Sequence, residues 1–363
     1  MFSIVIFTLF LRLAVAAPSI DFQLTPGKTP LDVTASVTNS GSDDISVMKF
    51  SPVLATAPVK HFRMFDEQGD ELPFSGVSIF YDIEGAGADA WETIPAGQTI
   101  VRSIDLSATH ELKSAGKHTI WANGRFQVIE GPYSKATAAS QTLHSYNTNL
   151  TIPIAKSDVA ASVERTLLQK RVSIGACSTQ QGGTMQGDFG VAKTLAARAA
   201  DRTRARDGQY VFSQFYHTTD AQTVAKVADT FQKISDAATV STGSKITANC
   251  NGSPQYCTAN VLAYAAFFVG VQGQGNVYAC PPFWSLPREA PSCSGYGQAD
   301  VLVHELSHLY GTEDVAYGYG ASQQLSTADA VRNADTYMFY SRCKSRIPMT
   351  VFPTLIIFSA LAC

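Results

Sequence analysis

The stretch that decides the fold reads Val301-Leu302-Val303-His304-Glu305-Leu306-Ser307-His308-Leu309-Tyr310-Gly311-Thr312-Glu313-Asp314. His304 and His308 are four residues apart, so on a helix they lie on one face, one turn from each other. Two imidazoles at this spacing can bind one zinc ion, with Glu305 beside them as the general base. Because Ala299 and Val301–Val303 are apolar, we expect this helix to be buried.

A tetrahedral catalytic zinc site needs a third protein ligand and one open position. Gly311 can turn the chain back under the metal, since glycine accepts a positive φ. Asp314, six residues after His308, can then complete a site of two histidines and one aspartate. Glu313 and the more distant Asp335 are the rival carboxylates.

The HExxH pattern alone is a weak signal, because any helix that contains His and Glu can produce it by chance. Residues 110–114 read HELKS and lack the second histidine. The alternative interpretation of His304 and His308 is two polar residues on a solvated helix face. The apolar flanks, and the glycine and aspartate that follow, favour the metal site.

The composition gives no sign of a nucleic-acid-binding protein. With 363 residues the chain is long enough for two domains, each with its own core. Its net charge is −3 and 16% of its residues are charged. Basic and acidic residues balance in residues 172–363, so no strong field steers a charged partner.

The N-terminus has the features of a secretory signal peptide, residues 1–16. Phe2–Leu11 is a short apolar run, and Ala14-Val15-Ala16 has the small residues of a cleavage site. The run is too short to span a bilayer. We therefore expect a secreted protein without a membrane span.

The cysteines are confined to the second half of the chain. All seven lie between Cys177 and Cys363. In a secreted chain this distribution indicates a disulfide-stapled domain, and the odd number leaves one cysteine over. An oxidising secretory route disfavours the alternative of buried free thiols.

Residues 18 to about 150 have the pattern of an all-β domain. Leu31, Val33, Ala35 and Val37 alternate with polar residues, as in a half-buried strand. Further short apolar runs are separated by turn sequences, such as residues 39–44 and 66–70. This spacing predicts an Ig-like β-sandwich.

A polar linker follows the β-rich part. Residues 134–171 are rich in Ser, Thr, Ala and Lys, have a helical pattern around Val159–Leu168, and end in Lys170-Arg171. Secretory processing proteases cut behind such a dibasic pair, and this pair lies six residues before Cys177. We therefore expect residues 17–171 to be a propeptide that covers or chaperones the domain of residues 172–363.

The second half is mainly helical. Its helices are expected at Phe189–Arg206, after the capping residues Thr219-Asp220, at Gln298–Tyr310 and at Thr327–Arg342. Residues 245–283 are rich in β-branched and aromatic residues, which predicts a small antiparallel sheet. Such a sheet beside the helix of His304 can offer an edge strand to an extended peptide.

Together these residues resemble the deuterolysin family of secreted fungal zinc endopeptidases. The family signature places a GTxDxxYG segment after HExxH, and this segment reads GTEDVAYG at Gly311–Gly318. The resemblance extends to Asn333–Tyr337, to the β-rich pro-region and its dibasic end, and to about Ser341. It also includes the spacing of five cysteines, Cys177, Cys250, Cys257, Cys280 and Cys293.

The resemblance implies a mainly α, zincin-like catalytic domain with one zinc ion held by His304, His308 and Asp314. Glu305 would be the catalytic base. The implied activity is hydrolysis of peptide bonds in extracellular proteins, by an enzyme made as a pre-pro-enzyme. We expect it to be a monomer. The implied disulfides join Cys177 to Cys250, Cys257 to Cys280, and Cys293 to either Cys343 or Cys363.

Three features depart from the family pattern. Gly311 follows only three residues after His308, where members usually have a longer insert, and other zinc proteases coordinate through this shorter spacing. Phe283 stands where some members have a tyrosine, and Tyr317 is the candidate substitute as a catalytic oxyanion donor. Residues 342–363 form a divergent tail.

The alternative function is a catalytically weakened or inactive zinc-binding homologue that acts as a secreted binding or surface protein. The short loop and Phe283 favour it. A membrane anchor in the tail is disfavoured, because Val351–Ala362 is short and broken by Pro353. The expected partners are protein or peptide substrates and the chain's own propeptide, with no nucleic acid.

Overall fold

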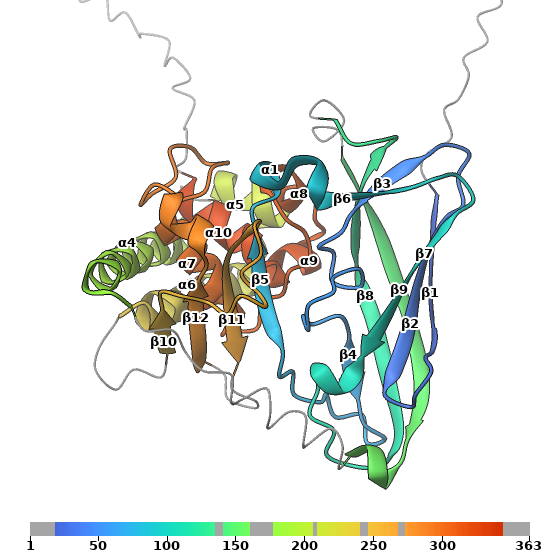
Figure 1. The fold of residues 1–363 in the computed structure, drawn as a ribbon. Coiled ribbons are helices and arrows are strands. Elements are labelled where there is room, and N and C mark those ends of the chain that lie inside the picture. The colour runs from blue at the N-terminus through green and yellow to red at the C-terminus, as the bar shows by residue number, and fades with distance from the viewer. Residues whose placement is uncertain are drawn as a thin grey trace, which may run out of the picture.

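The structure is a computed structural model that describes residues 19–134, 141–159, 177–205, 209–239, 246–267 and 273–343. The expected signal peptide, the expected helix beyond Val159, Lys170-Arg171 and the tail after Cys343 lie outside the described residues. Two regions lie side by side (Figure 1). We call residues 19–159 the N-terminal β region and residues 177–343 the C-terminal region.

The N-terminal β region contains two antiparallel sheets. The first has the order β1-β2-β7 and the second the order β4-β8-β3-β6, with β9 paired to β8. Their strands are β1 (Ile20–Pro26), β2 (Asp32–Asn39), β3 (Ile45–Met48), β4 (Arg63–Phe65), β6 (Trp91–Ile94), β7 (Thr99–Asp105), β8 (Gly116–Glu130) and β9 (Thr142–Ile154). Short helical turns interrupt them, namely α1 (Ile83–Ala86), η1 (Gly87–Ala90) and η2 (Leu106–Ala108).

One hydrophobic core lies between these two sheets. The alternation expected in β2 is confirmed, since Val33, Ala35 and Val37 are buried while their neighbours are partly exposed. They pack with Phe126 and Val128 of β8. Two sheets therefore share a core, but the Ig-like sandwich expected from the sequence is not confirmed by this strand order.

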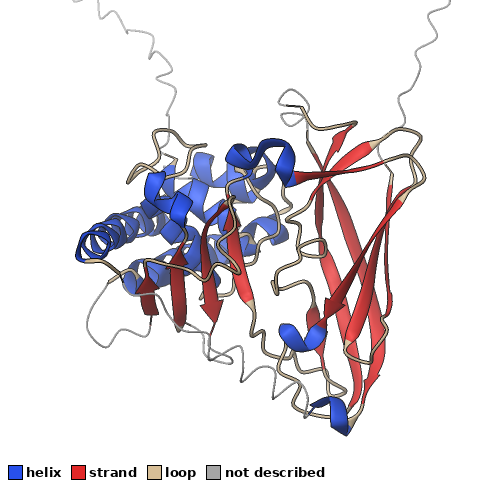
Figure 2. Cartoon of the chain, viewed as in Figure 1, coloured by secondary structure: helices blue, strands red, loops and turns tan. Residues whose placement is uncertain are grey.

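The C-terminal region is built around one buried helix, α7 (Gln298–His308), in which every residue is buried. Helices α4, α6 and α10 contact it, as do strands of a small sheet (Figure 2). The helices of this region are α4 (Thr179–Arg204), α5 (Gln209–Tyr216), α6 (Ala221–Ala237), α8 (Tyr319–Ser322), α9 (Thr327–Arg332) and α10 (Ala334–Arg342), with the 3-10 turn η4 (Pro281–Ser285).

Two helix predictions have clear outcomes. Asp220 caps α6 as expected, because its carboxylate accepts hydrogen bonds from the backbone N–H groups of Gln222 and Thr223. The single helix expected at Thr327–Arg342 is wrong. Asn333 has extended backbone angles and separates α9 from α10, which frees its side chain to bond a neighbouring loop.

The small sheet beside α7 has the order β10-β12-β11-β5. Its strands are β10 (Ile246–Asn249), β11 (Val261–Phe267), β12 (Gly275–Ala279) and β5 (Val77–Tyr81). The expected antiparallel pairing holds for β11 with β12 and with β5, whereas β10 runs parallel to β12. The edge strand β5 belongs to the N-terminal β region, so the two regions share this sheet (Figure 1).

Three disulfides staple the C-terminal region. They join Cys177 to Cys250, Cys257 to Cys280, and Cys293 to Cys343. These are the pairings that the resemblance implied, and of the two candidate partners of Cys293 the structure uses Cys343. Within the described ranges, no helix is both long and apolar enough to cross a bilayer.

We expect acid to destabilise the N-terminal β region through His61 and His110. Both are buried, and burial lowers the pKa of His61 to about 4 and that of His110 to about 3. Their ordinary pKa of 6.5 applies to the unfolded chain, which therefore binds more protons below pH 6.5. Stability is full above that pH and falls by roughly 1.4 kcal/mol per pH unit for each histidine as the pH drops toward the folded values.

Thermal unfolding at pH 7.5 and pH 5.0 measures this loss. Carboxylates also contribute to acid unfolding, so the control is the double variant His61→Gln/His110→Gln. Its melting temperature should fall less between the two pH values than that of the unchanged chain. An equal fall in both would contradict the assignment.

Candidate metal centre

Helix α7 holds its polar residues inside the protein because its apolar residues fill the core around them. Val301, Leu302 and Leu306 are fully buried in the C-terminal core. The helix begins after Gly297, and Asp300 in its first turn accepts a hydrogen bond from the Ala290 N–H at 2.8 Å. The apolar flanks thus predicted the burial of this helix correctly.

After α7 the chain turns back toward the two histidines. Gly311 has φ of 95°, the positive value that the sequence led us to expect at this turn. Thr312 ties the turn to the helix, because its hydroxyl lies 2.6 Å from the Ser307 hydroxyl. The short loop therefore brings Asp314 beside His304 and His308.

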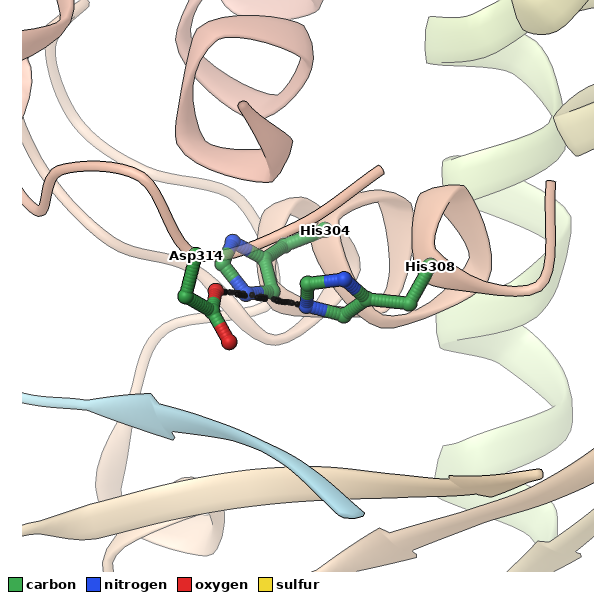
Figure 3. A group of neighbouring side chains, drawn as sticks. All are labelled: His304, His308 and Asp314. Atoms are coloured by element: carbon green, nitrogen blue, oxygen red, sulfur yellow. Dashed lines mark hydrogen bonds and ion pairs between the residues drawn. The ribbon is translucent and has the colours of Figure 1, made fainter. Parts of the chain in front are cut away.

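Three side-chain atoms converge at this point (Figure 3). The Nε2 atoms of His304 and His308 lie 3.0 Å apart, and Asp314 Oδ1 lies 3.2 Å from the first and 3.3 Å from the second. Ligand atoms around a tetrahedral zinc ion with bonds of about 2.0–2.1 Å are separated by roughly 3.3 Å. The spacing of the three atoms fits such an ion.

The other ring nitrogens of the two histidines face fixed acceptors. His304 Nδ1 lies 2.8 Å from Asp335 Oδ1, and the other oxygen of Asp335 accepts the Gly318 N–H. His308 Nδ1 lies 3.1 Å from the Thr312 carbonyl oxygen. With the proton of each ring on Nδ1, facing these acceptors, both Nε2 lone pairs are left for the shared space.

The rival carboxylates occupy other positions. Glu313 pairs with Lys60 at 3.1 Å and with Arg332, so its charge is used away from the histidines. Asp335 lies behind His304 rather than beside Asp314. The structure therefore brings Asp314, and neither rival, beside both Nε2 atoms, and it brings Asp335 to the other ring nitrogen of His304.

The electrostatics of this group favour a bound cation. Burial alone would lower the pKa of His304, but Asp314 and Asp335 outweigh it and raise that pKa to about 10. Burial alone would raise the pKa of Asp314, but His308 and His304 hold it well below its ordinary value. A positive charge between these side chains is thus stabilised by buried carboxylates.

Glu305 is buried next to this group. Burial raises the pKa of its carboxyl well above the ordinary value, and the nearby charges of Asp314 and Asp335 raise it further against the effect of His304. Neither of its oxygens accepts a hydrogen bond from the residues that the structure describes. A carboxylate in this state is a strong proton acceptor.

Tyr317 reaches a peptide carbonyl rather than open space. Its hydroxyl donates to the Ile79 carbonyl oxygen at 3.2 Å, and the side-chain amide of Gln127 bonds both its backbone N–H and its carbonyl at 2.8 Å. Phe283 is fully buried in the core.

Two residues near the site were not predicted. Asn333 Oδ1 accepts the N–H groups of Val315 and Ala316 at 3.0 and 3.1 Å and so fixes the loop after Asp314. One indication of Asn333 was present in the sequence, because it begins the segment Asn333–Tyr337 over which the chain resembles the deuterolysin family. Phe80 lies with its ring centre 4.4 Å from that of His304, and no local pattern indicated this contact.

Comparison with known proteins identifies the family of this chain. A model of the Deuterolysin metalloprotease (M35) family matches residues 4–347, which confirms the resemblance. Neutral protease 2 homolog MEP6 of Coccidioides posadasii is 29% identical over 346 residues, covering 93% of this chain and 94% of the relative. Neutral protease 2 of Aspergillus oryzae is 30% identical over 335 residues, covering 90% of this chain and 91% of the relative. A solved zinc peptidase from Grifola frondosa is 23% identical with a TM-score of 0.36, covering 46% of this chain and 96% of that one.

Zinc affinity should separate the roles of the carboxylates. Asp335→Ala is expected to weaken zinc binding by roughly 10- to 100-fold, because His304 loses the acceptor that orients its ring. Asp314→Ala should weaken it further, because a ligand is lost. Competition with a chromogenic chelator measures both, and Glu313→Ala is the control with near-unchanged affinity. Wild-type affinity in Asp314→Ala would refute the ligand set.

Proposed function

The chain belongs to the Deuterolysin metalloprotease (M35) family, and from this premise we propose that it is a secreted zinc-dependent endopeptidase made as a pre-pro-enzyme. Family membership makes it a metalloendopeptidase that acts on proteins. Beyond this, we propose that the chain is secreted, that its propeptide is cleaved off, and that the residues named below carry out the reaction.

The observation that carries the proposal is the convergence of His304 Nε2, His308 Nε2 and Asp314 Oδ1. These three atoms would hold one zinc ion. Bound zinc would polarise a carbonyl group and make a water molecule acidic enough to lose a proton near neutral pH.

Glu305 would be the catalytic base. It is buried on α7, and the charges of His304, Asp314 and Asp335 all act on its carboxyl, which supports a place beside the proposed metal ligands. It would accept the proton of the attacking water and return it to the leaving amine. The raised pKa of its carboxyl suits a group that must first take up and then hold a proton.

Tyr317 would stabilise the oxyanion. Its hydroxyl already donates to a peptide carbonyl oxygen, that of Ile79, which supports a role as a donor to substrate carbonyls. Phe283, which stands at the position of the family tyrosine, has no hydroxyl to offer. The backbone N–H groups near the metal would share this role.

In the proposed maturation, residues 1–16 are removed on secretion and residues 17–171 form the propeptide. Cleavage behind Lys170-Arg171 yields the peptidase, residues 172–363, acting as a monomer on extracellular proteins. The three disulfides of the C-terminal region support an oxidising, extracellular location.

The alternative is an inactive zinc-binding homologue, suggested by the short loop after His308 and by Phe283. The position of Asp314 removes the first of these grounds, because the short loop still delivers the carboxylate to both histidines. We therefore favour the active enzyme.

Glu305→Gln tests the base. Glutamine keeps the shape of the side chain but cannot take up the proton, so the rate should fall by roughly two to four orders of magnitude. Casein hydrolysis, followed to its steady rate after cleavage behind Arg171, measures this effect, and zinc content should stay near one per chain. Unchanged hydrolysis in this variant would disprove the assignment.

Metal removal tests the cofactor. Dialysis against a strong chelator should abolish hydrolysis, because the three ligand residues alone cannot polarise a carbonyl. One equivalent of zinc should restore it, whereas magnesium should not, since a site with two imidazoles suits zinc. Full activity in the metal-free protein would exclude a metallopeptidase mechanism.

A further inference from the structure

Strand β5 completes the sheet of the C-terminal region although it comes from the N-terminal β region. It pairs antiparallel with β11 over five residues, with Ile79 opposite Tyr264 and Ser78 opposite Ala265. All five residues of β5 are buried. Without β5, β11 would be the edge strand of this sheet, with its backbone groups open to a partner.

One face of β5 is anchored beside the metal ligands. The Phe80 side chain is fully buried, and its ring centre lies 4.4 Å from that of His304 and 5.4 Å from that of Tyr296. Figure 3 shows a strand in the colour of β5 passing beside His304, His308 and Asp314. β5 thus lies beside His304, and Ser78 of β5 lines one cavity together with His308 and Asp314.

The backbone of β5 also engages Tyr317. The Ile79 carbonyl oxygen accepts the hydrogen bond of the Tyr317 hydroxyl. Under the proposed function this hydroxyl serves a substrate carbonyl, so Ile79 takes the place of that carbonyl. Gln127 of β8 clamps the backbone of Tyr317 as well, so a second strand of the N-terminal β region reaches the same loop.

Ion pairs also join the N-terminal β region to the C-terminal region. Lys60 pairs with Glu313 at 3.1 Å, and Arg125 pairs with Asp329 at 2.7 Å. Between them lies a cavity of about 480 Å³ lined by residues of both regions, including Ser78 of β5 and Asp314. The N-terminal β region therefore contacts His304 through Phe80, and it pairs with Glu313 and Asp329 in the segments that follow α7.

We infer that β5 is an inhibitory strand that occupies the place of an extended substrate on β11, and that it stays there after cleavage behind Arg171. An extended peptide that joins the sheet by β-augmentation needs the same edge of β11 that β5 covers. Every contact described above lies outside residues 160–176, so a cut at Arg171 removes none of them. The cut chain is therefore latent, as a complex of two pieces, until β5 withdraws.

This inference rests on the proposed function, and the test separates the two. The full chain is cut behind Arg171 by a dibasic-specific processing protease, and mass spectrometry verifies the cut. Hydrolysis of casein is then followed together with the loss of the N-terminal piece. We expect a lag. During it, the rate of casein hydrolysis should be lower by roughly tenfold or more than after the N-terminal piece has dissociated or been degraded.

Phe80→Ala should shorten the lag, because it removes the aromatic anchor beside His304. The just-cut variant should be roughly tenfold or more active than the just-cut unchanged chain, as expected when a buried aromatic contact of an interface is truncated. Phe22→Ala is the matched control. Phe22 packs on Phe126 and Tyr146 within the N-terminal β region, so its loss should leave the lag unchanged.

Hydrogen exchange gives a second readout if Phe80→Ala fails to fold. In the chain carrying Glu305→Gln, the amides of β5 and β11 should be equally protected before and after the cut. A synthetic peptide of residues 76–82 should also inhibit the fully activated protein, and the same peptide with alanine for Phe80 should inhibit it far less.

Full activity immediately after the cut, with β5 and β11 still protected, would overturn the inference. So would equal lags in Phe80→Ala and Phe22→Ala. A chain that binds zinc but never hydrolyses casein, even after the N-terminal piece is gone, would instead refute the proposed function.

Discussion

His304, His308 and Asp314 converge inside the protein, and the rest of the C-terminal region serves to hold them there. The Nε2 atoms of the two histidines and Asp314 Oδ1 lie within hydrogen-bonding distance of one another. Burying these polar atoms costs free energy unless neighbouring groups orient the side chains and a proton or cation lies between them. Asp335 and the Thr312 carbonyl supply that orientation from outside. The Nε2 atoms of both rings are thereby left facing Asp314, as a bound cation requires.

The orientation depends on segments that follow α7 rather than on α7 alone. Asn333 interrupts the helical stretch of α9 and α10, and its side chain bonds the backbone of the loop that carries Asp314. Two residues later, Asp335 pairs with His304 through one carboxylate oxygen and accepts the Gly318 N–H with the other. If one helix continued across Asn333, Asn333 and Asp335 would be directed differently. They could not then contact both the loop that carries Asp314 and the ring of His304.

The sheet beside α7 illustrates a conflict between stability and function. An unpaired β11 edge leaves backbone groups without partners, and this is the surface that an extended peptide would use. Pairing with β5 satisfies those groups and buries Phe80 beside His304. The same contacts that complete the fold of the full chain therefore compete with access to the metal centre.

The sequence alone determined the elements whose signals are local. The spacing of His304 and His308, the glycine at Gly311 and the alternation in β2 follow from the 3.6- and 2-residue periods of helix and strand and from glycine's backbone freedom. The cap at Asp220 and the confinement of cysteines to the second half were equally readable. Only the tertiary structure decided which carboxylate faces the histidines, because Lys60 and Arg332 engage Glu313 while Asp335 lies behind His304. It alone also placed β5 on the sheet of the C-terminal region, since Ile79 and Tyr317 are 238 residues apart and no pattern along the chain encodes a contact made by packing two distant segments.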